Sequence, residues 1–315
     1  MIEIQHLTKR YGDKLAVNDA SFTIRKGEIL GFLGRNGAGK TTTMNIITGY
    51  ISASDGTVLL DGYDILAEPR EVKRRIGYLP ELPPLYPDMT VDEYLRFVCA
   101  IKDVKRSQVK SHLDDITELV SLTEVRKRLI RNLSKGYRQR VGMAQALIGN
   151  PEVVILDEPT VGLDPKQILE VRRLIRRLGE DHTIVLSSHI LPEVADVCDR
   201  LVIIHQGRIV AEDSLEHLTN ADGESRKIRL RVAGPEKDIL EALRATDGVL
   251  QVDCMGSHEK ESFDFLLHGE KDRDIRREVF ARMAALGYPI LIQRPMDLDL
   301  EDVFLQLTGD SGEEA

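Results

Sequence analysis

The chain has 315 residues, of which 42% are hydrophobic and 30% are charged, and its formal net charge at pH 7 is −9. These values are typical of a soluble globular protein with one large domain and one small domain, or with two of middling size. They argue against a protein that binds nucleic acid through a basic surface, and no apolar run approaches the roughly 18 residues of a membrane-spanning helix.

The excess negative charge lies at the C-terminal end of the chain. From Asn220 onward there are 13 Lys/Arg and 21 Asp/Glu residues, whereas the first 219 residues hold 30 and 31. The three cysteines, Cys99, Cys198 and Cys254, lie far apart in the sequence. We expect them to be buried thiols in a reducing compartment, with no metal site among them.

Short apolar runs alternate with helical patterns over the first 219 residues, which is typical of an α/β domain. The run at 28–34 predicts a strand that leads into a Gly-rich turn, followed by a helix from about Gly39 to about Gly49. The continuous, β-branched runs at 153–157, 183–187 and 201–205 predict buried strands of a largely parallel sheet. We therefore expect a domain over residues 1–219 built around such a sheet.

A helical pattern interrupts this domain at about residues 88–150. Thr90 and Glu93 have the spacing of a capping box, which predicts a helix that begins at this point. The helix predicted next carries one apolar stripe, formed by Val109, Leu113, Ile116 and Val120. A further helix is predicted to begin after Ser134 and to end at Asn150-Pro151.

The pattern changes after a polar stretch at 219–225, which predicts a linker. Alternating strands and two helices follow in the order β-α-β-β-α-β, which is typical of a small ferredoxin-like module. A last helix is predicted from Leu300, Val303, Phe304 and Leu307. We place this accessory domain at 226–308 and expect the tail at 309–315 to be disordered.

A Gly-rich stretch between the first predicted strand and helix fits G-x-x-x-x-G-K-[ST], in the structural context that this phosphate-binding motif requires. Its backbone N–H groups and the helix N-terminus would face the phosphates, and Lys40 would reach the β- and γ-phosphates while Thr41 binds Mg²⁺. A chance Gly-rich turn is the alternative. The candidate nucleotide-binding residues here are Gly34, Arg35, Asn36, Gly37, Ala38, Gly39, Lys40, Thr41 and Thr42.

Asp157 ends the strand predicted at 153–157, and Glu158 follows it directly. Asp157 can hold Mg²⁺ through water opposite Thr41, and Glu158 can position or deprotonate an attacking water. A pair of carboxylates at a solvated strand end is the alternative, and the presence of Lys40 and Thr41 argues against it.

Several further motifs follow in a fixed order: a "LSKGY" stretch, "VVILDE", "VGLDP" and "SSH". Together with the phosphate-binding motif and the helical insert, they make residues 1–218 resemble the ATP-binding subunits of ABC transporters. The resemblance implies a P-loop NTPase fold, ATP and Mg²⁺ as cofactors, and a head-to-tail dimer with two ATP molecules between protomers. It also implies that Tyr11 stacks on adenine, that His189 contacts the γ-phosphate and that Asp164 contacts the dimer partner. For Tyr11, a half-exposed loop tyrosine is the alternative.

The "LSKGY" stretch would face the ATP molecule of the other protomer. Ser134 supplies a hydroxyl and Gly136 allows close backbone approach. Lys135 and Tyr137 replace the usual residues of this signature, and Lys135 would add positive charge near the phosphate. A second departure is Glu81, which stands where the family usually has a Gln that touches Mg²⁺ or water and links to the membrane subunit.

We therefore predict the ATPase subunit of an ABC transporter, of the ABC-2 type that the "YLPE" version of the loop and "LSKGYRQR" resemble, with export as the direction of transport. Closure of a homodimer, or of a heterodimer with a different ATPase chain, would drive separate transmembrane permease subunits. The N-terminus has no signal-peptide pattern, so we expect a cytoplasmic protein held at the inner face of the membrane by its partner. A soluble ABC ATPase acting on nucleic acid or the ribosome, and a P-loop kinase, are the alternatives.

Overall fold

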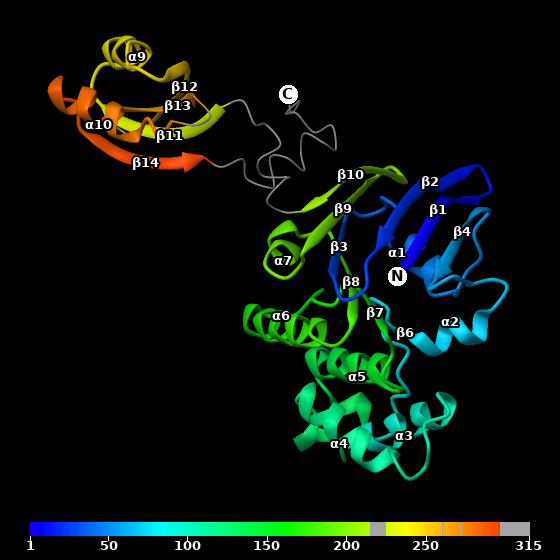
Figure 1. Cartoon of the computed structure of the whole chain (residues 1–315). Coiled ribbons are helices and arrows are strands. Elements are labelled where there is room, and N and C mark those ends of the chain that lie inside the picture. The colour runs from blue at the N-terminus through cyan, green and yellow to red at the C-terminus, as the bar shows by residue number, and fades with distance from the viewer. Residues whose placement is uncertain (215–224, 260, 271–272, 297–315) are drawn as a thin grey trace. The chain divides into compact units, whose positions relative to one another are not determined.

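The continuous apolar runs of the N-terminal region pair into a six-stranded sheet (Figure 1). The structure is a computed structural model that describes residues 1–214, 225–259, 261–270 and 273–296. The strand order is β10-β9-β3-β8-β7-β6, with β10 antiparallel to β9 and the other neighbours parallel. Every residue of β3, β7 and β8 is buried, which confirms the predicted parallel strands. The strands are β3 (Ile29–Leu33), β6 (Ile76–Leu79), β7 (Val153–Asp157), β8 (Thr183–Ser188), β9 (Arg200–His205) and β10 (Arg208–Ser214).

A four-stranded antiparallel sheet, which the sequence pattern does not predict, packs against this α/β core. Its order is β2-β1-β4-β5. The first strand, β1, pairs on one side with the next strand and on the other with a strand some fifty residues later, so that Ile2 lies opposite both Ile24 and Leu60. The Phe22 ring lies 5.3 Å from the Phe32 ring of β3, within one core shared by both sheets. The strands are β1 (Ile2–Tyr11), β2 (Lys14–Ile24), β4 (Asp55–Leu60) and β5 (Tyr63–Asp64).

Four helices connect the strands of this part of the chain. The N-terminal end of α1 follows the carboxyl end of β3, and the N-terminal end of α6 follows the segment after β7, so both helices begin at the same edge of the parallel sheet. Ligands of open α/β folds bind at this edge. The helices are α1 (Lys40–Ile47), α2 (Pro69–Arg75), α6 (Pro165–Gly179) and α7 (Leu191–Ala195).

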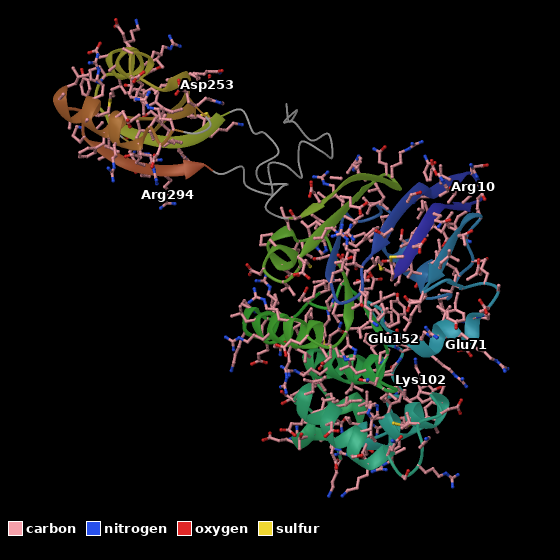
Figure 2. The ribbon with its side chains drawn as sticks, in the orientation of Figure 1. Arg10, Glu71, Lys102, Glu152, Asp253 and Arg294 are labelled. Atoms are coloured by element: carbon pink, nitrogen blue, oxygen red, sulfur yellow. The ribbon has the colours of Figure 1, made fainter. Side chains whose placement is uncertain are left out.

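The helical insert lies between β6 and β7 and comprises α3 (Val91–Ile101), α4 (Val109–Leu119) and α5 (Lys135–Leu147). The capping box of Thr90 and Glu93 is present in both directions, and Ser134 is the N-cap of α5, as predicted. The three helices contact one another. Lys102, labelled in Figure 2, donates from its ammonium to the backbone oxygens of Lys73 and Ile76, which ties the insert to the start of β6.

The chain divides into two units, Met1–Leu215 and Glu216–Ala315. In the second unit the sheet order is β12-β13-β11-β14, antiparallel throughout, with the core formed between the sheet and the helices. This is the ferredoxin-like arrangement that the sequence predicts. The predicted helix at 300–307, the tail and most of the linker lie outside the described residues. The elements are β11 (Ser225–Ala233), α9 (Glu236–Arg244), β12 (Val249–Glu259), β13 (Ser262–Glu270), α10 (Arg276–Ala285) and β14 (Ile290–Met296).

One expectation about the cysteines is wrong. Cys99 and Cys198 are buried, and burial raises the pKa of both thiols. Cys254, however, is exposed. It lies on β12, an edge strand of the sheet in the second unit, which pairs with β13 alone among the described strands.

Candidate nucleotide site

The turn between β3 and α1 has the geometry of a phosphate-binding loop. Gly39 precedes the helix with φ of 114°, and a Cβ atom there would lie 2.6 Å from the carbonyl oxygen of Ala16. At Gly34 a Cβ atom would lie 2.5 Å from the carbonyl oxygen of Ile204. Both positions therefore require glycine, and α1 begins at this sheet edge, where the first N–H groups of a helix have no intrahelical partner.

Lys40 lies at the centre of this turn. Its side chain is 5% exposed, and its ammonium donates to the carbonyl oxygens of Gly34 at 2.8 Å and Arg35 at 3.3 Å. Its third contact is Glu158, whose Oε1 atom lies 3.2 Å away. A buried ammonium with these three partners is held in one position, which is what a residue that receives a phosphate group requires.

Asp157 ends β7 in a fully buried position. Its Oδ1 atom accepts a hydrogen bond from Ser187 Oγ at 2.5 Å, while Oδ2 accepts none from the residues that the structure describes. Burial raises the pKa of the Asp157 carboxyl, and the charge of Glu158 adds to this effect, whereas the hydroxyls of Ser187 and Thr41 lower it. The Oδ2 atom of Asp157 is therefore available to a cation or to a hydrogen-bond donor.

The next residue, Glu158, faces a different set of partners. Its backbone φ is 48°, an unusual value for a residue with a side chain, and its N–H donates to the carbonyl oxygen and the hydroxyl of Ser187. The buried carboxylate contacts Lys40 through one oxygen and accepts from His189 Nδ1 through the other, at 2.9 Å. The turn therefore separates two adjacent carboxylates, one toward Ser187 and one between Lys40 and His189.

The same edge suits a divalent cation that prefers oxygen. Mg²⁺ is usually held by one or two protein oxygens and completes its octahedron with water and substrate phosphates. The free Oδ2 atom of Asp157, with the Thr41 hydroxyl close enough to affect its pKa, fits this requirement. Within the described ranges there is no cluster of three or more His, Cys, Asp or Glu residues that could hold a metal by itself.

The "LSKGY" stretch forms the start of α5. Ser134 caps the helix by accepting from the N–H of Tyr137 at 3.4 Å, and Tyr137 is 37% exposed. Asp164 is the N-cap of α6 and forms a capping box with Gln167. In the part of the chain that the structure describes, no hydrogen bond or ion pair joins residues 134–137 or Asp164 to Lys40 and its partners.

Tyr11 and Glu81 are exposed. Tyr11 ends β1 with half of its surface accessible, and the ammonium of Lys9 lies 5.2 Å from its ring centroid. Glu81 lies in the segment between β6 and α3. No hydrogen bond or ion pair between the described residues connects either side chain to Lys40.

The structure adds Ser187, whose role is not evident from the sequence. This residue contacts Asp157 through its hydroxyl and Glu158 through both its hydroxyl and its carbonyl oxygen. The available signal was its place two residues before His189, at the end of a predicted strand. A second addition is the buried hydrogen bond from the Thr160 hydroxyl to Glu193, which joins the segment after β7 to α7.

Comparison with known proteins agrees with this geometry. The family model described as ABC transporter matches residues 17–161. The linearmycin resistance ATP-binding protein LnrL of Bacillus subtilis is 34% identical over 312 residues, which cover 98% of each chain. The chain belongs to the ATP-binding proteins of ABC transporters.

Other relatives of this ABC transporter subunit are similar over most of their length. The Nod factor export ATP-binding protein I of Burkholderia lata is 33% identical, over 98% of this chain and 97% of its own. The bacitracin transport ATP-binding protein BcrA of Bacillus licheniformis is 40% identical, over 69% of this chain and 71% of its own.

Solved structures support the same fold. An ATP-binding subunit of an ABC transporter aligns with a TM-score of 0.65 and 30% identity, over 71% of this chain and 93% of its own. A dimeric bacterial ABC transporter cassette aligns with a TM-score of 0.63 and 25% identity, over 68% and 99%. The predicted P-loop NTPase fold is therefore confirmed, and the chain is an ATP-binding, ATP-hydrolysing transporter subunit.

In the described ranges, none of the helices has the length and apolar character needed to cross a membrane.

Proposed function

We propose that this ABC ATPase drives export through separate transmembrane permease subunits, and that it acts as a dimer closing on two Mg²⁺-ATP. The observation that carries the proposal is the similarity over 98% of the chain to ATP-binding proteins named for linearmycin resistance and for Nod factor export. The dimeric cassette of similar fold supports the assembly. A homodimer is the simplest arrangement, because one chain carries every motif; a heterodimer with a second ATPase chain is the alternative.

Residues 34–42 are proposed to hold the triphosphate. The N–H groups of the turn and of the first turn of α1 face the phosphates, and Lys40 exchanges its contact with Glu158 for a phosphate oxygen. The ring of Tyr11 stacks on adenine. The support is that one face of this ring has the Lys9 cation over it while the side chain remains half exposed, so a face is available for a second planar group.

Mg²⁺ would be held by the Thr41 hydroxyl and, directly or through water, by Asp157. When bound, the ion supplies charge neutralisation for the phosphate oxygens. Ser187 fixes one oxygen of Asp157 and leaves Oδ2 for this role. Glu158 is the proposed general base for the attacking water, and His189 orients its carboxylate and contacts the γ-phosphate.

The partner's ATP is proposed to lie against residues 134–137 of this chain. Ser134 contributes its hydroxyl and the N-terminal end of α5 contributes N–H groups and a favourable partial charge. Lys135 and Tyr137 flank the contact, and Asp164 contacts the partner chain. Two complete sites form only when two chains face each other head to tail.

The contact with the permease is proposed to involve the segment that begins at Glu81. Leu82 next to it is 79% exposed, and the rings of Tyr86 and Phe97 lie 5.5 Å apart and are 49% and 38% exposed. Exposed apolar side chains of this segment and of the neighbouring α3 are typical of an interaction surface. Binding there would hold the chain at the inner face of the cell membrane.

The proposal is tested by crosslinking in membranes prepared from cells that produce this chain, with the crosslinked membrane protein identified by mass spectrometry. Leu82→Cys is placed in a Cys254→Ser background, which removes the exposed native thiol. Leu250→Cys, at a similarly exposed apolar residue of the second unit, is the matched comparison. We expect Leu82→Cys to crosslink to the permease. Crosslinking from the second unit alone would refute the coupling role of the Glu81 segment, and failure of the permease to co-purify would refute the transport assembly.

The second unit is proposed to be an accessory domain, over residues 226–308, that regulates or supports the dimer. The support is its separate core and the negative charge of the sequence from Asn220 onward. The described fold gives no reason to assign it to substrate binding, and specificity is expected to lie in the permease.

A further inference from the structure

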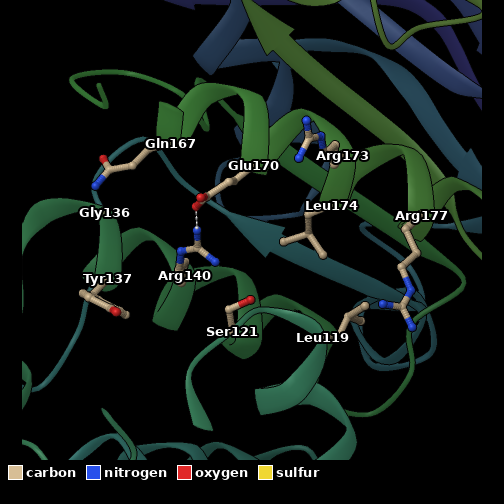
Figure 3. Close-up of a pocket in the computed structure, with 10 residues that line it drawn as sticks. All are labelled: Leu119, Ser121, Gly136, Tyr137, Arg140, Gln167, Glu170, Arg173, Leu174 and Arg177. Carbon is tan, nitrogen blue, oxygen red and sulfur yellow. Dashed lines mark hydrogen bonds and ion pairs between the residues drawn. The ribbon is translucent and has the colours of Figure 1, made fainter. Parts of the chain in front are cut away.

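The beginnings of α5 and α6 lie against each other within one chain. Figure 3 shows the amide of Gln167, on α6, directed at the backbone of Gly136, on α5. A Cβ atom at position 136 would lie 2.8 Å from both Nε2 and Oε1 of Gln167. The Gln167 side chain therefore occupies the space that glycine leaves open. Because Gly136 has no positive φ, this contact explains a glycine there without any appeal to backbone conformation.

Gln167 also caps its own helix. Its Oε1 atom accepts from the N–H of Asp164 at 3.4 Å, and its own N–H donates to Asp164 Oδ1 at 2.9 Å. One amide group thus touches the residue proposed to contact the partner chain and the residue proposed to face the partner's ATP. This side chain connects the two segments that a dimer would engage.

A second contact joins the same two segments. A Cβ atom at Gly162 would lie 2.0 Å from the Nζ atom of Lys135. On each side, a glycine therefore accommodates a side chain from the other segment: Lys135 over Gly162 and Gln167 over Gly136. The segments 134–137 and 161–167 fit together as one unit.

The helices are not closely packed beyond this point. A pocket of about 460 Å³ separates α5 from α6, and Gly136, Arg140, Gln167 and Glu170 are among its lining residues. Figure 3 shows the Arg140–Glu170 ion pair crossing it one turn below the Gln167 contact. Across this pocket the Arg140–Glu170 ion pair joins the two helices, and the Gln167 contact joins them at their beginnings.

We propose that Gln167 is a positioning residue that holds Gly136 in register with Asp164, so that the signature and the dimer-contacting loop of one chain move together. The inference rests on the proposed composite site. Its consequence is that closure of the signature on one ATP moves the loop that contacts the partner chain. Removing Gln167 should slow turnover of the assembled dimer while leaving ATP binding to the P-loop unchanged.

The test is a double-mutant cycle of Gly136→Ala and Gln167→Ala in the full chain, with ATPase kinetics as the readout. Gln167→Ala should lower kcat by about fivefold, the size of coupling between residues in contact, with KM for ATP within about twofold of wild type. Gly136→Ala should lower kcat further, because its methyl group meets the amide. The double variant should recover part of the loss of Gly136→Ala, because the clashing atoms are gone.

Two variants separate positioning from helix capping. Gln167→Glu retains the capping box, since Glu serves equally at this position, but replaces the amide nitrogen that faces position 136 with a charged carboxylate oxygen. It should keep the melting temperature of wild type and share the lower kcat of Gln167→Ala. Glu180→Gln, at the exposed C-terminal end of the same helix and outside both segments, is the control and should leave kcat unchanged.

Three results would overturn the inference. The first is a cycle in which the effects of the two substitutions on kcat simply multiply. Gly136 and Gln167 would then act independently, and Gly136 would be needed only for contact with the partner's phosphate. The second is full activity of Gln167→Glu together with a loss of stability in Gln167→Ala, because capping alone would then explain the residue. The third is a Glu158→Gln chain that binds ATP and never dimerises, which would also refute the composite site. The first two outcomes, obtained with a chain that does dimerise, refute only the positioning role.

Discussion

The substitution Glu158→Gln tests the centre of the proposed site. Glu158 is buried and shares its carboxylate between Lys40 at 3.2 Å and His189 at 2.9 Å. Glutamine has nearly the same shape, keeps one oxygen for Lys40, and removes the charge and the basicity. Lys40 also retains the carbonyl oxygens of Gly34 and Arg35, so we expect the site to keep its geometry.

Two effects of opposite sign follow for ATP. Loss of a general base lowers the rate of hydrolysis by about 10² to 10⁴, which corresponds to roughly 3–5 kcal/mol in the activation barrier. Affinity should rise, because ATP no longer competes with an ionised carboxylate for Lys40. A hydrogen bond to a charged group exceeds a neutral one by about 1 kcal/mol, which corresponds to roughly fivefold in Kd. Loss of the Glu158 charge should also lower the pKa of Asp157 and favour Mg²⁺ binding.

The assay measures phosphate release in single turnover, ATP affinity with a fluorescent analogue, and mass by light scattering. We expect ATP to accumulate unhydrolysed and to hold a dimer. Adding Ser134→Arg should leave ATP binding intact and keep the chain monomeric, because a bulky side chain blocks the signature. Glu118→Gln, at an exposed helix position, is the charge-matched control. A Glu158→Gln chain that hydrolyses ATP at more than about a tenth of the wild-type rate would refute the general-base role.

Three further predictions concern binding and stability. Lys40→Ala should abolish ATP binding and leave the domain folded, with Lys26→Ala as control; unchanged affinity for a fluorescent ATP analogue would contradict the phosphate role. Asp157→Asn should abolish Mg²⁺-dependent hydrolysis but raise the free energy of unfolding of the nucleotide-free chain at pH 7 by about 0.5–2 kcal/mol, a few degrees in Tm by calorimetry. The reason is that the raised pKa of Asp157 makes its ionised form a cost to folding above that pKa, a cost that disappears as the pH falls through it; a lower Tm at pH 7 would contradict this. A chain ending at Thr219 should remain folded and bind ATP, as circular dichroism and the same analogue would show, whereas loss of all structure would indicate one continuous domain.

The part of the fold that the sequence predicts well is the part with local signals. The strand at 153–157 is an uninterrupted apolar run rich in β-branched residues. The first helix follows Gly39, a glycine in a tight turn. Such features depend on neighbours within a few residues, so spacing alone locates them. The same holds for the capping box of Thr90 and Glu93, which the structure confirms in both directions.

The N-terminal antiparallel sheet has no comparable local signal. Its first strand contains register shifts on both sides, and His6 has a φ of 52°, so the alternation of apolar and polar residues is broken. Its pairing of Ile2 with Leu60 joins residues that are far apart in the sequence. Which strands pair across such a distance is decided by the packing of the whole core, where Phe22 meets Phe32.

In the candidate site, too, the sequence gives the type of each residue but not the distant residue that it contacts. By the family resemblance, Lys135 replaces a usual residue of the signature, and its charge is expected near a phosphate. The structure shows that the ammonium lies over Gly162 of its own chain, a contact that requires knowledge of which glycine faces it. The substitution at 135 and the glycine at 162 are therefore best understood together. A lysine in the signature is compatible with a close dimer because the chain's own loop has room for its side chain, and the charge then lies between the loop and the site proposed for the partner's ATP.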